Sequence, residues 1–585
     1  MSSKSSMEYY PNLKEISPIR AMAKTILLNH NVRRVTAAQA YEMAQNQPGV
    51  SRTDMPIYPP AARRLGLPEG AMVLNDCHGQ VIGRTAKARR FYNRMDASEK
   101  RKVEGDLREA IYQLQHYDLI CAEAVLGLDP DLMIRAHYVT TSTDAMNVFN
   151  WLVNFMPFEL VEDEYNRSKP LPIKDIIIVA FNEWSCDDPF YHCVGQPQLA
   201  LVDEQHNVIF NLGMRYFGER KKGTLTLAWT SGMRLGMAAS HGGIKEIDFS
   251  QCTDEKFRKL KKSSIAFYGL SGTGKSSHTN SHDNGGTLPE GFKKVVLHDD
   301  AFQIDPRKKV CRVWEPSLFD KTDSRDLDHP DWKYCLSVMN HSLIQAFGRT
   351  LPLGMDVRNA NGRALIDRDL LGEWVNRCSF PKALVWLMKD ICLPPALKFS
   401  DKHLAVAMGA ALMTKRSRAE NVTEEELKKL VFEPFANPFR VYELHKDVEA
   451  FLEVIDSGAE VYTFNSTGFW KCSEAELEDI PLQTSLTLQT LILTEQIEWE
   501  PCGFLPGALV PTKDSIDPHL PGYYERYSIA ARENPEDMKD LMRDRFKQRR
   551  KYLFKSDLQS QPQLLKKLLH VLHIEAEEVD LDDDL

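Results

Sequence analysis

The sequence predicts a mixed α/β fold with an N-terminal domain and a C-terminal domain that contains a phosphate-binding loop. Short apolar runs suited to strands alternate with amphipathic stretches suited to helices. A glycine-rich loop directly follows one of these runs, in the order strand, loop, helix. The chain has 585 residues, of which 43% are hydrophobic, so it has enough apolar mass for more than one core.

Four segments are expected along the chain. Residues 1–60 are polar and contain several prolines, so we expect an extension that packs only partly. Residues 61–250 mix helical and strand-like stretches and are expected to form a substrate-binding domain. Residues 251–555 contain the glycine-rich loop and are expected to form a nucleotide- and metal-binding domain, and residues 556–585 an acidic tail.

The apolar pattern also predicts individual elements. Helices are expected over residues 97–119 and 536–552, the second of them charged and exposed. Strands are expected over residues 176–181, 264–268, 295–298, 384–388 and 460–464.

Composition and charge exclude several classes of protein. The 73 basic and 82 acidic residues give a formal charge of -9, which is no basis for broad binding to nucleic acid or to anionic membranes. No apolar run reaches the roughly 20 residues that a membrane-spanning helix needs. The N-terminus lacks a secretory pattern, and the 11 cysteines are scattered, so we expect a cytoplasmic location and reduced thiols. The oligomeric state stays open.

The glycine-rich loop is the most specific motif in the chain. The apolar run 264–268 leads into Gly269-Leu270-Ser271-Gly272-Thr273-Gly274-Lys275-Ser276-Ser277, which fills every position of the Walker A pattern. Its glycines let several backbone N–H groups point at phosphate oxygens. Lys275 is expected to neutralise the terminal phosphates of ATP, and the Ser276 hydroxyl to bind Mg²⁺.

Two adjacent carboxylates follow the next apolar run. Asp299 and Asp300 come directly after the expected strand 295–298. Such a pair is usually a turn at the end of a strand, but a divalent ion that bridges phosphates needs hard oxygen ligands near the loop. We therefore expect both residues at a metal site, with Asp300 as the first choice of ligand.

The sequence upstream of the loop points to one family. The segment Tyr216-Phe217-Gly218-Glu219-Arg220-Lys221-Lys222-Gly223 and the downstream His241 resemble ATP-type phosphoenolpyruvate carboxykinase in residues and order. Further fragments follow in the family's order: Gly83-Arg84-Thr85-Ala86-Lys87, Asp320-Lys321-Thr322, Asn361-Gly362-Arg363, Leu393-Pro394-Pro395, Glu433-Pro434 and Leu509-Val510-Pro511-Thr512.

The resemblance implies an activity in gluconeogenesis. Oxaloacetate would be decarboxylated and the terminal phosphate of ATP transferred to the enolate, which gives phosphoenolpyruvate, CO₂ and ADP. The implied catalytic residues are Arg84, Lys221, Lys222, Ser271, Lys275 and Arg363. The implied substrate-binding residues are Arg84, Tyr216, Lys222 and Arg363. Arginine forks suit a substrate with two carboxylates.

The resemblance also implies the cofactor sites. Mn²⁺ would be held by Lys222, His241 and Asp300 beside Asp299, while Mg²⁺ would bind with ATP at Ser276. Lys222 can bind a metal only when deprotonated, so its pKa must be depressed by the cation and by Lys221. Lys321 and Lys471 would contact the nucleotide in addition to residues 269–277.

Several positions depart from the family's pattern. Ala301-Phe302 replaces the usual Glu-His after the paired aspartates, and Gly242-Gly243-Ile244-Lys245 replaces Cys-Ser-Ala-Asn after the histidine. Thr85-Ala86 replaces Ser-Pro in the substrate loop, and residues 466–471 reduce the adenine-contacting stretch to Ser-Thr-Gly-Phe-Trp-Lys. Two alternatives therefore stay open: a related kinase with another carboxylate metabolite or a protein hydroxyl as acceptor, and a weakly catalytic nucleotide-binding regulatory or scaffold protein.

Overall fold

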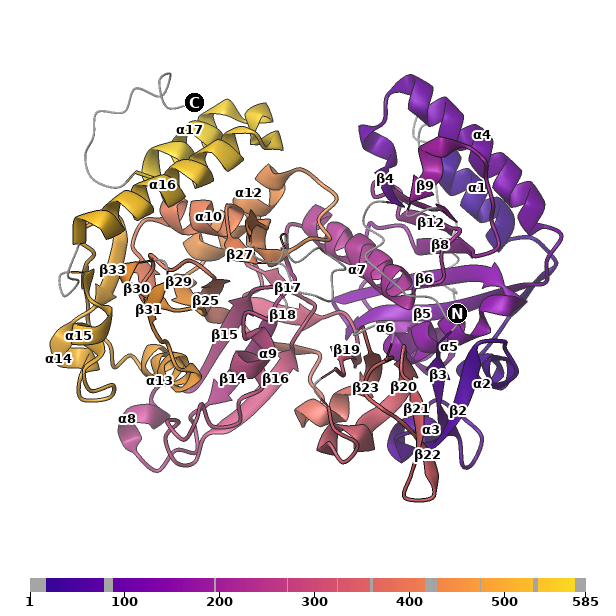
Figure 1. The fold of residues 1–585 in the computed structure, drawn as a ribbon. Helices are drawn as coiled ribbons and strands as arrows, with labels where there is room; N and C mark the ends of the chain where they lie inside the picture. Colours follow the sequence, from indigo (N-terminus) through magenta and orange to yellow (C-terminus); the bar gives the residue numbers. More distant parts are fainter. Residues whose placement is uncertain are drawn as a thin grey trace. The chain divides into compact units, whose positions relative to one another are not determined.

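The structure of the chain is a computed structural model with a mixed α/β fold, as the sequence predicts. It describes residues 17–77, 88–193, 196–270, 272–323, 325–357, 361–415, 425, 429–473, 475–529 and 535–573. The chain forms two compact units (Figure 1). The first takes mainly residues 1–231 and 313–372, and the second mainly residues 232–312, 373–418 and 422–585.

The first unit contains an eight-stranded sheet in the order β1-β5-β6-β8-β12-β11-β4, with β7 paired to β5. Its strands are β1 (Val32–Arg34), β4 (Arg89–Phe91), β5 (Leu119–Asp129), β6 (Leu132–Thr141), β7 (Met156–Pro157), β8 (Ile176–Phe181), β11 (Leu199–Asp203) and β12 (Val208–Leu212). All residues of β8 and β12 are buried, as expected for strands covered on both faces. Helices α1 (Pro18–Leu27) and α4 (Ala97–Leu114) share a core with this sheet.

A second sheet of the first unit explains why residues 313–372 belong to it. The sheet has five strands in the order β19-β23-β20-β3-β2. They are β2 (Val50–Pro56), β3 (Met72–Asp76), β19 (Ser317–Lys321), β20 (Cys335–Met339) and β23 (Arg363–Asp367). Helix α5 (Ala145–Asn154) contacts both sheets and is buried at every position. The predicted domain limits remain a prediction. They treat each domain as one continuous segment, so they do not describe the return of residues 313–372 to the first unit.

The N-terminal segment is folded into the first unit from residue 17 onward, where we expected an extension that packs only partly. Strand β1 pairs with β5, and β2 pairs with β3. Helix α2 (Ala37–Gln45) packs against α5. Its polar surface hid a regular amphipathic pattern, because α1 and α2 bury only four side chains each and β2 only two.

The second unit contains another eight-stranded sheet, in the order β16-β14-β15-β25-β29-β26-β33-β32. Its strands are β14 (Gly243–Asp248), β15 (Lys262–Tyr268), β16 (Lys293–His298), β25 (Pro381–Met388), β26 (Ala396–Phe399), β29 (Glu460–Asn465), β32 (Trp499–Pro501) and β33 (Ala508–Pro511). Strands β15, β25 and β29 are parallel neighbours, so their carboxyl ends meet at one edge of the sheet. Ligands of open α/β sheets bind at this edge.

A four-stranded sheet lies beside it in the order β13-β17-β18-β24. The strands are β13 (Ala238–Ser240), β17 (Phe302–Asp305), β18 (Val310–Val313) and β24 (Arg377–Ser379). The second unit also contains the helices α9 (Lys275–Asn280), α10 (Lys402–Ala410), α12 (Leu444–Asp456), α13 (Leu482–Leu493), α16 (Pro535–Phe554) and α17 (Pro562–Val571). Figure 1 shows α10, α12, α16 and α17 together on one side of the larger sheet, and α13 on the other side.

Most predicted elements are confirmed, and two need correction. The five predicted strands lie within β8, β15, β16, β25 and β29. The first predicted helix ends at Leu114 instead of Leu119, because Leu119 starts β5. The second, α16, is not simply exposed: it buries Met538, Met542 and Phe546 at helical spacing.

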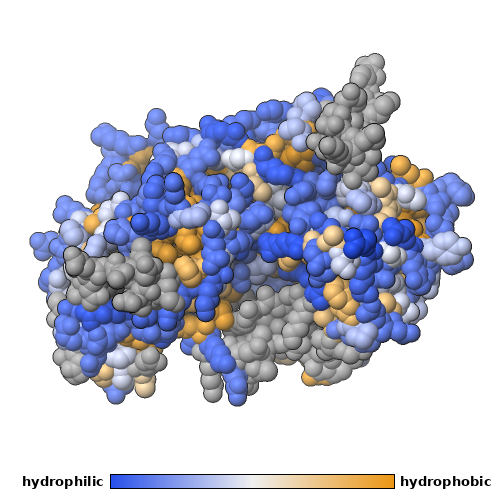
Figure 2. All heavy atoms as spheres, turned by 90° about the horizontal axis from the view of Figure 1, so that it is seen from above, coloured by the Kyte–Doolittle hydropathy of each residue, from blue (hydrophilic) through white to orange (hydrophobic). Residues whose placement is uncertain are grey.

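The surface and the helices agree with the hydrophilic composition. Hydrophilic residues cover most of the face shown in Figure 2, and hydrophobic residues appear in scattered patches. Among the described residues, no helix has both the length and the apolar character that crossing a membrane requires.

Candidate active site

Four chain segments with polar residues converge at one edge of the large sheet in the second unit. The glycine-rich loop leaves the carboxyl end of β15, and residues 299–300 leave the carboxyl end of β16. His241 precedes β14, which runs antiparallel to both strands. Lys389 follows the carboxyl end of β25. The strand directions therefore bring together segments that are far apart in the sequence.

The glycine-rich loop has the backbone geometry that its sequence predicts. Gly272 and Gly274 have φ values of 84° and 87°, in the left-handed region that favours glycine. Gly269 is required for space, since an added Cβ would lie 2.2 Å from Oγ1 of Thr273. That hydroxyl donates to the carbonyl of Leu270 at 2.8 Å and fixes the turn. Helix α9 then begins at Lys275.

His241 presents its Nε2 atom to Asp300. Its Nδ1 atom lies 2.6 Å from the backbone carbonyl of Ala436, which can only accept, so Nδ1 carries the proton. Nε2 lies 3.2 Å from Oδ1 of Asp300. A hydrogen bond from one ring nitrogen to a carbonyl is the usual way in which a metal-binding histidine is oriented. Nε2, the ring nitrogen that does not face Ala436, is therefore the one that could bind a metal together with the carboxylate of Asp300.

Strand pairing explains why these two residues meet. Ser240 pairs with Phe302 in the small sheet, and Ile244 pairs with His298 in the large sheet. The residues between these pairs form the passage from one sheet to the other, and there the N–H of Gly242 donates to the carbonyl of Asp300 at 3.1 Å. The same antiparallel ladder thus continues through the corner and places residue 241 beside residue 300.

The carbonyl that orients His241 depends on strained backbone. Phe435 and Ala436 have φ values of 50° and 52°, which residues other than glycine rarely adopt. The Phe435 ring stacks on Phe451 with centroids 4.5 Å apart and also contacts Trp386. This packing holds the left-handed turn and aims the Ala436 carbonyl at the histidine.

Lys275 and Ser276 complete the cluster. Nζ of Lys275 lies 3.4 Å from Oδ1 of Asp300, and the Ser276 hydroxyl donates to Oδ2 of Asp299 at 3.2 Å. A phosphate-loop lysine, a hydroxyl, two carboxylates and an imidazole nitrogen therefore lie together. The imidazole and carboxylate donors suit a transition metal such as Mn²⁺, and the hydroxyl and carboxylate donors suit Mg²⁺, so the residues fit both predicted ions.

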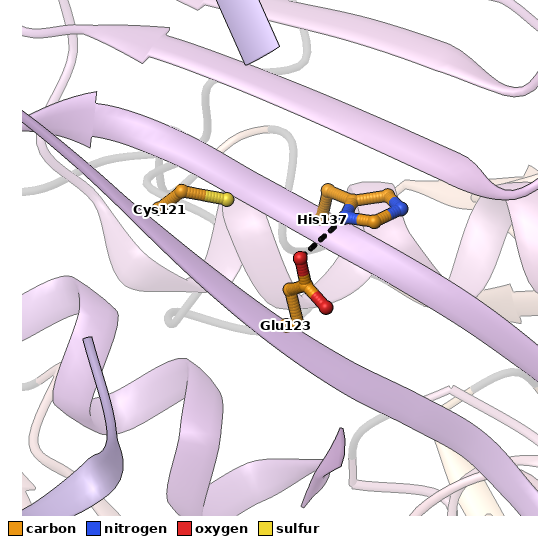
Figure 3. A group of neighbouring side chains, drawn as sticks. All are labelled: Cys121, Glu123 and His137. Atoms are coloured by element: carbon orange, nitrogen blue, oxygen red, sulfur yellow. Dashed lines mark ion pairs between the residues drawn. The ribbon is translucent and has the colours of Figure 1, made fainter. Parts of the chain in front are cut away.

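The first unit contains a different polar cluster, in which Cys121, Glu123 and His137 lie close together (Figure 3). The ligand atoms of these buried residues lie within 4.8 Å of one another. However, Arg34 and Arg135 both form ion pairs with Glu123. Two guanidinium groups on the one carboxylate disfavour a further cation.

The protonation of His137 also disfavours a metal in this cluster. Burial acts to lower the pKa of His137, but hydrogen bonds with Asp175, Cys121 and Glu123 outweigh it and raise the pKa to about 10. Nε2 of His137 lies 3.2 Å from Asp175. An imidazolium cannot bind a metal, so the cluster is best described as a buried ion-pair network.

Helix α7 (Phe217–Arg234) carries the predicted Lys221 and Lys222 in the first unit. Gly218 is required because an added Cβ would lie 2.5 Å from the ring of Tyr216. The motif residue Glu219 is held by two hydrogen bonds from Arg89, at 2.7 and 3.1 Å. The spacing of the motif thus fixes the Tyr216 ring against the first turn of the helix.

The two lysines have different surroundings. Lys221 is fully buried and its Nζ lies 2.9 Å from Oε1 of the equally buried Glu315. Its ammonium also faces the Phe319 ring at 5.6 Å. Lys222 is half-buried, with its Nζ 5.7 Å from the Trp229 ring. To contact the transferred phosphate as predicted, the Lys221 ammonium would have to break its ion pair with Glu315 or contact both groups at once.

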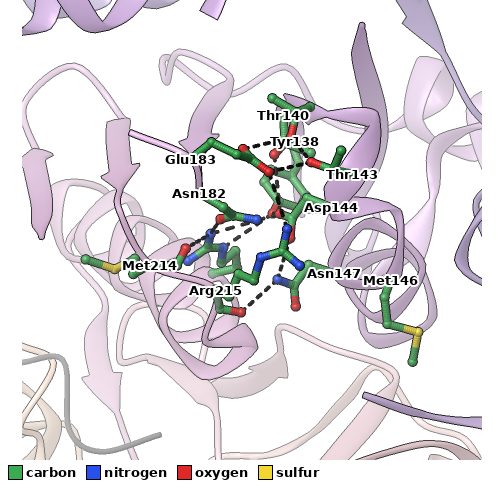
Figure 4. A network of polar contacts seen from close by, with 12 residues as sticks. Tyr138, Thr140, Thr143, Asp144, Met146, Asn147, Asn182, Glu183, Met214 and Arg215 are labelled. Carbon is green, nitrogen blue, oxygen red and sulfur yellow. Dashed lines mark hydrogen bonds and ion pairs between the residues drawn. The ribbon is translucent and has the colours of Figure 1, made fainter. Parts of the chain in front are cut away.

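A polar network fixes the chain just before α7 (Figure 4). Arg215 forms an ion pair with Glu183 at 3.3 Å, and its carbonyl accepts from Asn147 at 2.8 Å. The buried Arg220 donates to the carbonyl of Met214 and to the hydroxyl of Tyr138. These contacts brace both ends of the segment that carries Tyr216.

The other predicted residues are placed as follows. Lys321 and Arg363 are direct cross-strand partners on β19 and β23, so their side chains leave the same face of the sheet. Lys471 is an exposed residue of β30 (Phe469–Ser473). Arg84 and Ser271 lie outside the described residues. Ser277 follows Ser276 on α9 and is exposed.

The structure adds functional candidates that sequence reasoning missed. The Ala436 carbonyl leaves no sequence signal, because any residue supplies one. Lys245 is buried and donates to the carbonyl of His278 and to Asn284, each at 2.6 Å, so it braces α9. Burial and then the charge of Lys294 lower its pKa to about 7. The sequence offered one signal for Lys245, because this residue lies in the segment 242–245, which departs from the family's pattern.

The comparisons with known proteins agree with the motifs. Residues 88–302 match the family described as phosphoenolpyruvate carboxykinase, in its ATP-type model. The matched part includes the segment around Tyr216, His241, the glycine-rich loop and both aspartates. Arg84, Lys321, Arg363 and Lys471 lie outside it. A search of the curated proteins gave no match.

Proposed function

We propose that this chain, a phosphoenolpyruvate carboxykinase-like protein of the ATP type, converts oxaloacetate and ATP to phosphoenolpyruvate, CO₂ and ADP. The observation that carries the proposal is the cluster of Lys275, Ser276, His241, Asp299 and Asp300 at one sheet edge. A protein that only binds nucleotide has no need of an oriented histidine beside its phosphate loop. The family match supports the assignment, since it spans all five residues.

The loop of residues 269–277 is proposed to hold the phosphates of ATP. The Lys275 ammonium would weaken or break its contact with Asp300 in order to neutralise the terminal phosphates. The Ser276 hydroxyl would hold Mg²⁺. Lys321 and Lys471 remain proposed nucleotide contacts. Ser271 is proposed to act within the same loop.

His241 and Asp300 are proposed to hold Mn²⁺, with Asp299 beside them and Lys222 as the further ligand that the resemblance implies. The ion supplies positive charge that stabilises an enolate oxygen. The residues contribute orientation: Ala436 fixes the ring of His241, and Gly242 fixes the backbone of Asp300.

Arg84, Arg363 and Tyr216 are proposed to bind oxaloacetate. Its two carboxylates need fixed cationic forks, and Arg363 has its guanidinium carbon 5.9 Å from the Phe319 ring, a contact that limits its rotation. Lys221 and Arg363 are proposed to act on the migrating phosphoryl group together with Lys275.

The test is a coupled assay with oxaloacetate, ATP, Mn²⁺ and Mg²⁺, run beside the reverse reaction with bicarbonate. Formation of phosphoenolpyruvate supports the proposal. Arg84→Lys, which keeps the charge but loses the planar fork, should impair the use of oxaloacetate while ATP affinity stays unchanged.

A second candidate is a related kinase with a different acceptor. The observation that favours it is the departure of Thr85 and Ala86 from the family's substrate loop. Under this proposal the protein would bind ATP and both metals but form no phosphoenolpyruvate. Another carboxylate metabolite would then be the first acceptor to test.

A further inference from the structure

A lysine outside all the motifs lies beside the phosphate loop. Lys389 is the first residue after β25, and β25 is the parallel neighbour of β15, with Trp386 paired to Tyr268. The loop and Lys389 thus leave the same edge of the sheet from adjacent strands. A Cβ added to Gly272 would lie 3.9 Å from Nζ of Lys389. The ammonium therefore lies against the middle of the loop.

A second lysine lies close to the first. The backbone N–H of Lys389 donates to the carbonyl of Met413 at 3.1 Å, which ties it to β27 (Met413–Lys415). Burial first, and then the positive charge of Lys415, lower the pKa of Lys389. Two like charges are therefore held close enough to disfavour each other, and both are half-buried.

Lys389 and Lys415 have no carboxylate partner among the described residues, unlike two lysines of the large sheet. Lys382, at the start of β25, pairs with Glu495 at 2.6 Å, and Lys398 pairs with Glu460 at 2.5 Å. Within the part of the chain that the structure describes, neither Lys389 nor Lys415 forms an ion pair. Half-buried cations without a carboxylate are unfavourable in the protein alone, and a bound anion would compensate them.

We propose that Lys389 and Lys415 bind the phosphate chain of the nucleotide at the Gly272 side of the loop, while Lys275 binds its terminal phosphates. This inference rests on the proposed nucleotide function and adds a contact to the same site. The anion is the diphosphate unit that ADP and ATP share, because Gly272 lies in the middle of the loop and Lys275 at its end. Lys389 is the contact nearer to Gly272, and Lys415 reinforces it through charge.

The test is calorimetric titration of the full chain with ADP and, separately, with inorganic pyrophosphate. Lys389→Met should weaken both ligands about tenfold to a hundredfold, as expected for the loss of one charge-assisted contact. Lys415→Met should weaken both by a smaller factor. Lys389→Arg should restore most of the affinity, because the charge returns. Lys382→Met, on the same strand but paired with Glu495, is the matched control and should bind like the wild type.

Thermal unfolding of each variant separates a binding defect from a folding defect. ADP affinity that is unchanged in a folded Lys389→Met variant would overturn the inference and leave the proposed function standing. Weaker ADP binding with unchanged pyrophosphate binding would also overturn it, because the lysine would then contact the nucleoside. A wild-type chain that binds neither ligand would instead refute the nucleotide function, and this inference with it.

Discussion

Nε2 of His241 and Oδ1 of Asp300 lie 3.2 Å apart, at the point where an antiparallel ladder passes from the small sheet to the large sheet of the second unit. The carbonyl of Ala436 orients the imidazole through its other ring nitrogen, Nδ1. This pair connects the motif upstream of the phosphate loop with the carboxylates downstream of it.

His241→Ala should weaken Mn²⁺ binding at least about tenfold, because it removes a nitrogen ligand. Free Mn²⁺ measured by electron paramagnetic resonance gives the affinity directly. His403→Ala, which changes a histidine on α10 near Asp401, is the control and should bind Mn²⁺ like the wild type. Equal Mn²⁺ affinity in the His241 variant and the wild type would show that His241 is not a ligand.

Gly242→Ala should destabilise the protein and weaken Mn²⁺ binding. An added Cβ would lie 2.6 Å from the backbone carbonyl of Phe267, a rigid atom of β15, so the corner that holds His241 must move. Gly105→Ala is the matched control, because a Cβ there meets nothing within 4 Å. In the middle of α4 it should stabilise the protein by about 0.5–1 kcal/mol. Denaturant unfolding of both variants checks this, and a Gly242 variant as stable as the wild type contradicts it.

Arg549→Met should destabilise the protein by about 3–5 kcal/mol, because it leaves the carboxylate of Asp390 buried and unpaired. The two side chains are both fully buried and 2.7 Å apart, and they anchor α16 to the loop after β25. Lys551→Met, at an exposed position of α16, is the control. Urea unfolding gives both values. The double variant Arg549→Met with Asp390→Leu should recover part of the loss, whereas no recovery would argue against the ion pair as the cause.

The ion-pair network of His137 predicts a pH dependence of stability. Its pKa is raised from the ordinary value of 6.5 to about 10 because Asp175, Cys121 and Glu123 outweigh burial. The folded state therefore holds a proton that the unfolded state releases, so this stabilisation is complete below pH 6.5. It is lost as the pH rises from 6.5 towards 10. Asp175 and Glu123 face the ring as carboxylates, and Arg135 neutralises Glu123.

The measurement is the free energy of unfolding of the wild type and of His137→Gln at pH 6.5, 8 and 9.5. The difference in the free energy of unfolding between the two proteins should shrink with increasing pH. Other groups that titrate in this range are common to both proteins, so their contributions cancel in this difference. A constant difference would mean that the folded state does not raise the pKa of His137. In that case the metal interpretation of the cluster would regain support.

The sequence predicted the elements that carry the loop and the acidic pair, because each is a continuous run with a strong local pattern. The strand 264–268 lies inside β15, and the loop glycines adopt the left-handed conformation that the motif requires. The limits of α4 and the burial of α16 were predicted less well. Residues after Leu114 keep an apolar pattern but belong to a strand, and the charges of α16 hid its buried stripe.

The supports of the site could not be predicted, because they arise from pairing between distant strands. No local pattern links Ala436 to His241, which are 195 residues apart, or Lys389 to Gly272. One departure from the family has a physical reason in the structure. Gly242 replaces a residue with a side chain, and the carbonyl of Phe267 leaves no room for a Cβ there.

Formation of phosphoenolpyruvate from oxaloacetate and ATP is the most direct test of the proposed function. We would follow oxaloacetate, ATP, Mn²⁺ and Mg²⁺ by phosphorus nuclear magnetic resonance, in wild type and in Lys275→Ala. The wild type should form phosphoenolpyruvate and ADP in equal amounts, and the variant should form neither, because the charge that neutralises the migrating phosphate is lost. A wild-type protein that binds ATP and both metals yet forms no phosphoenolpyruvate, and fixes no bicarbonate in the reverse direction, would contradict the account.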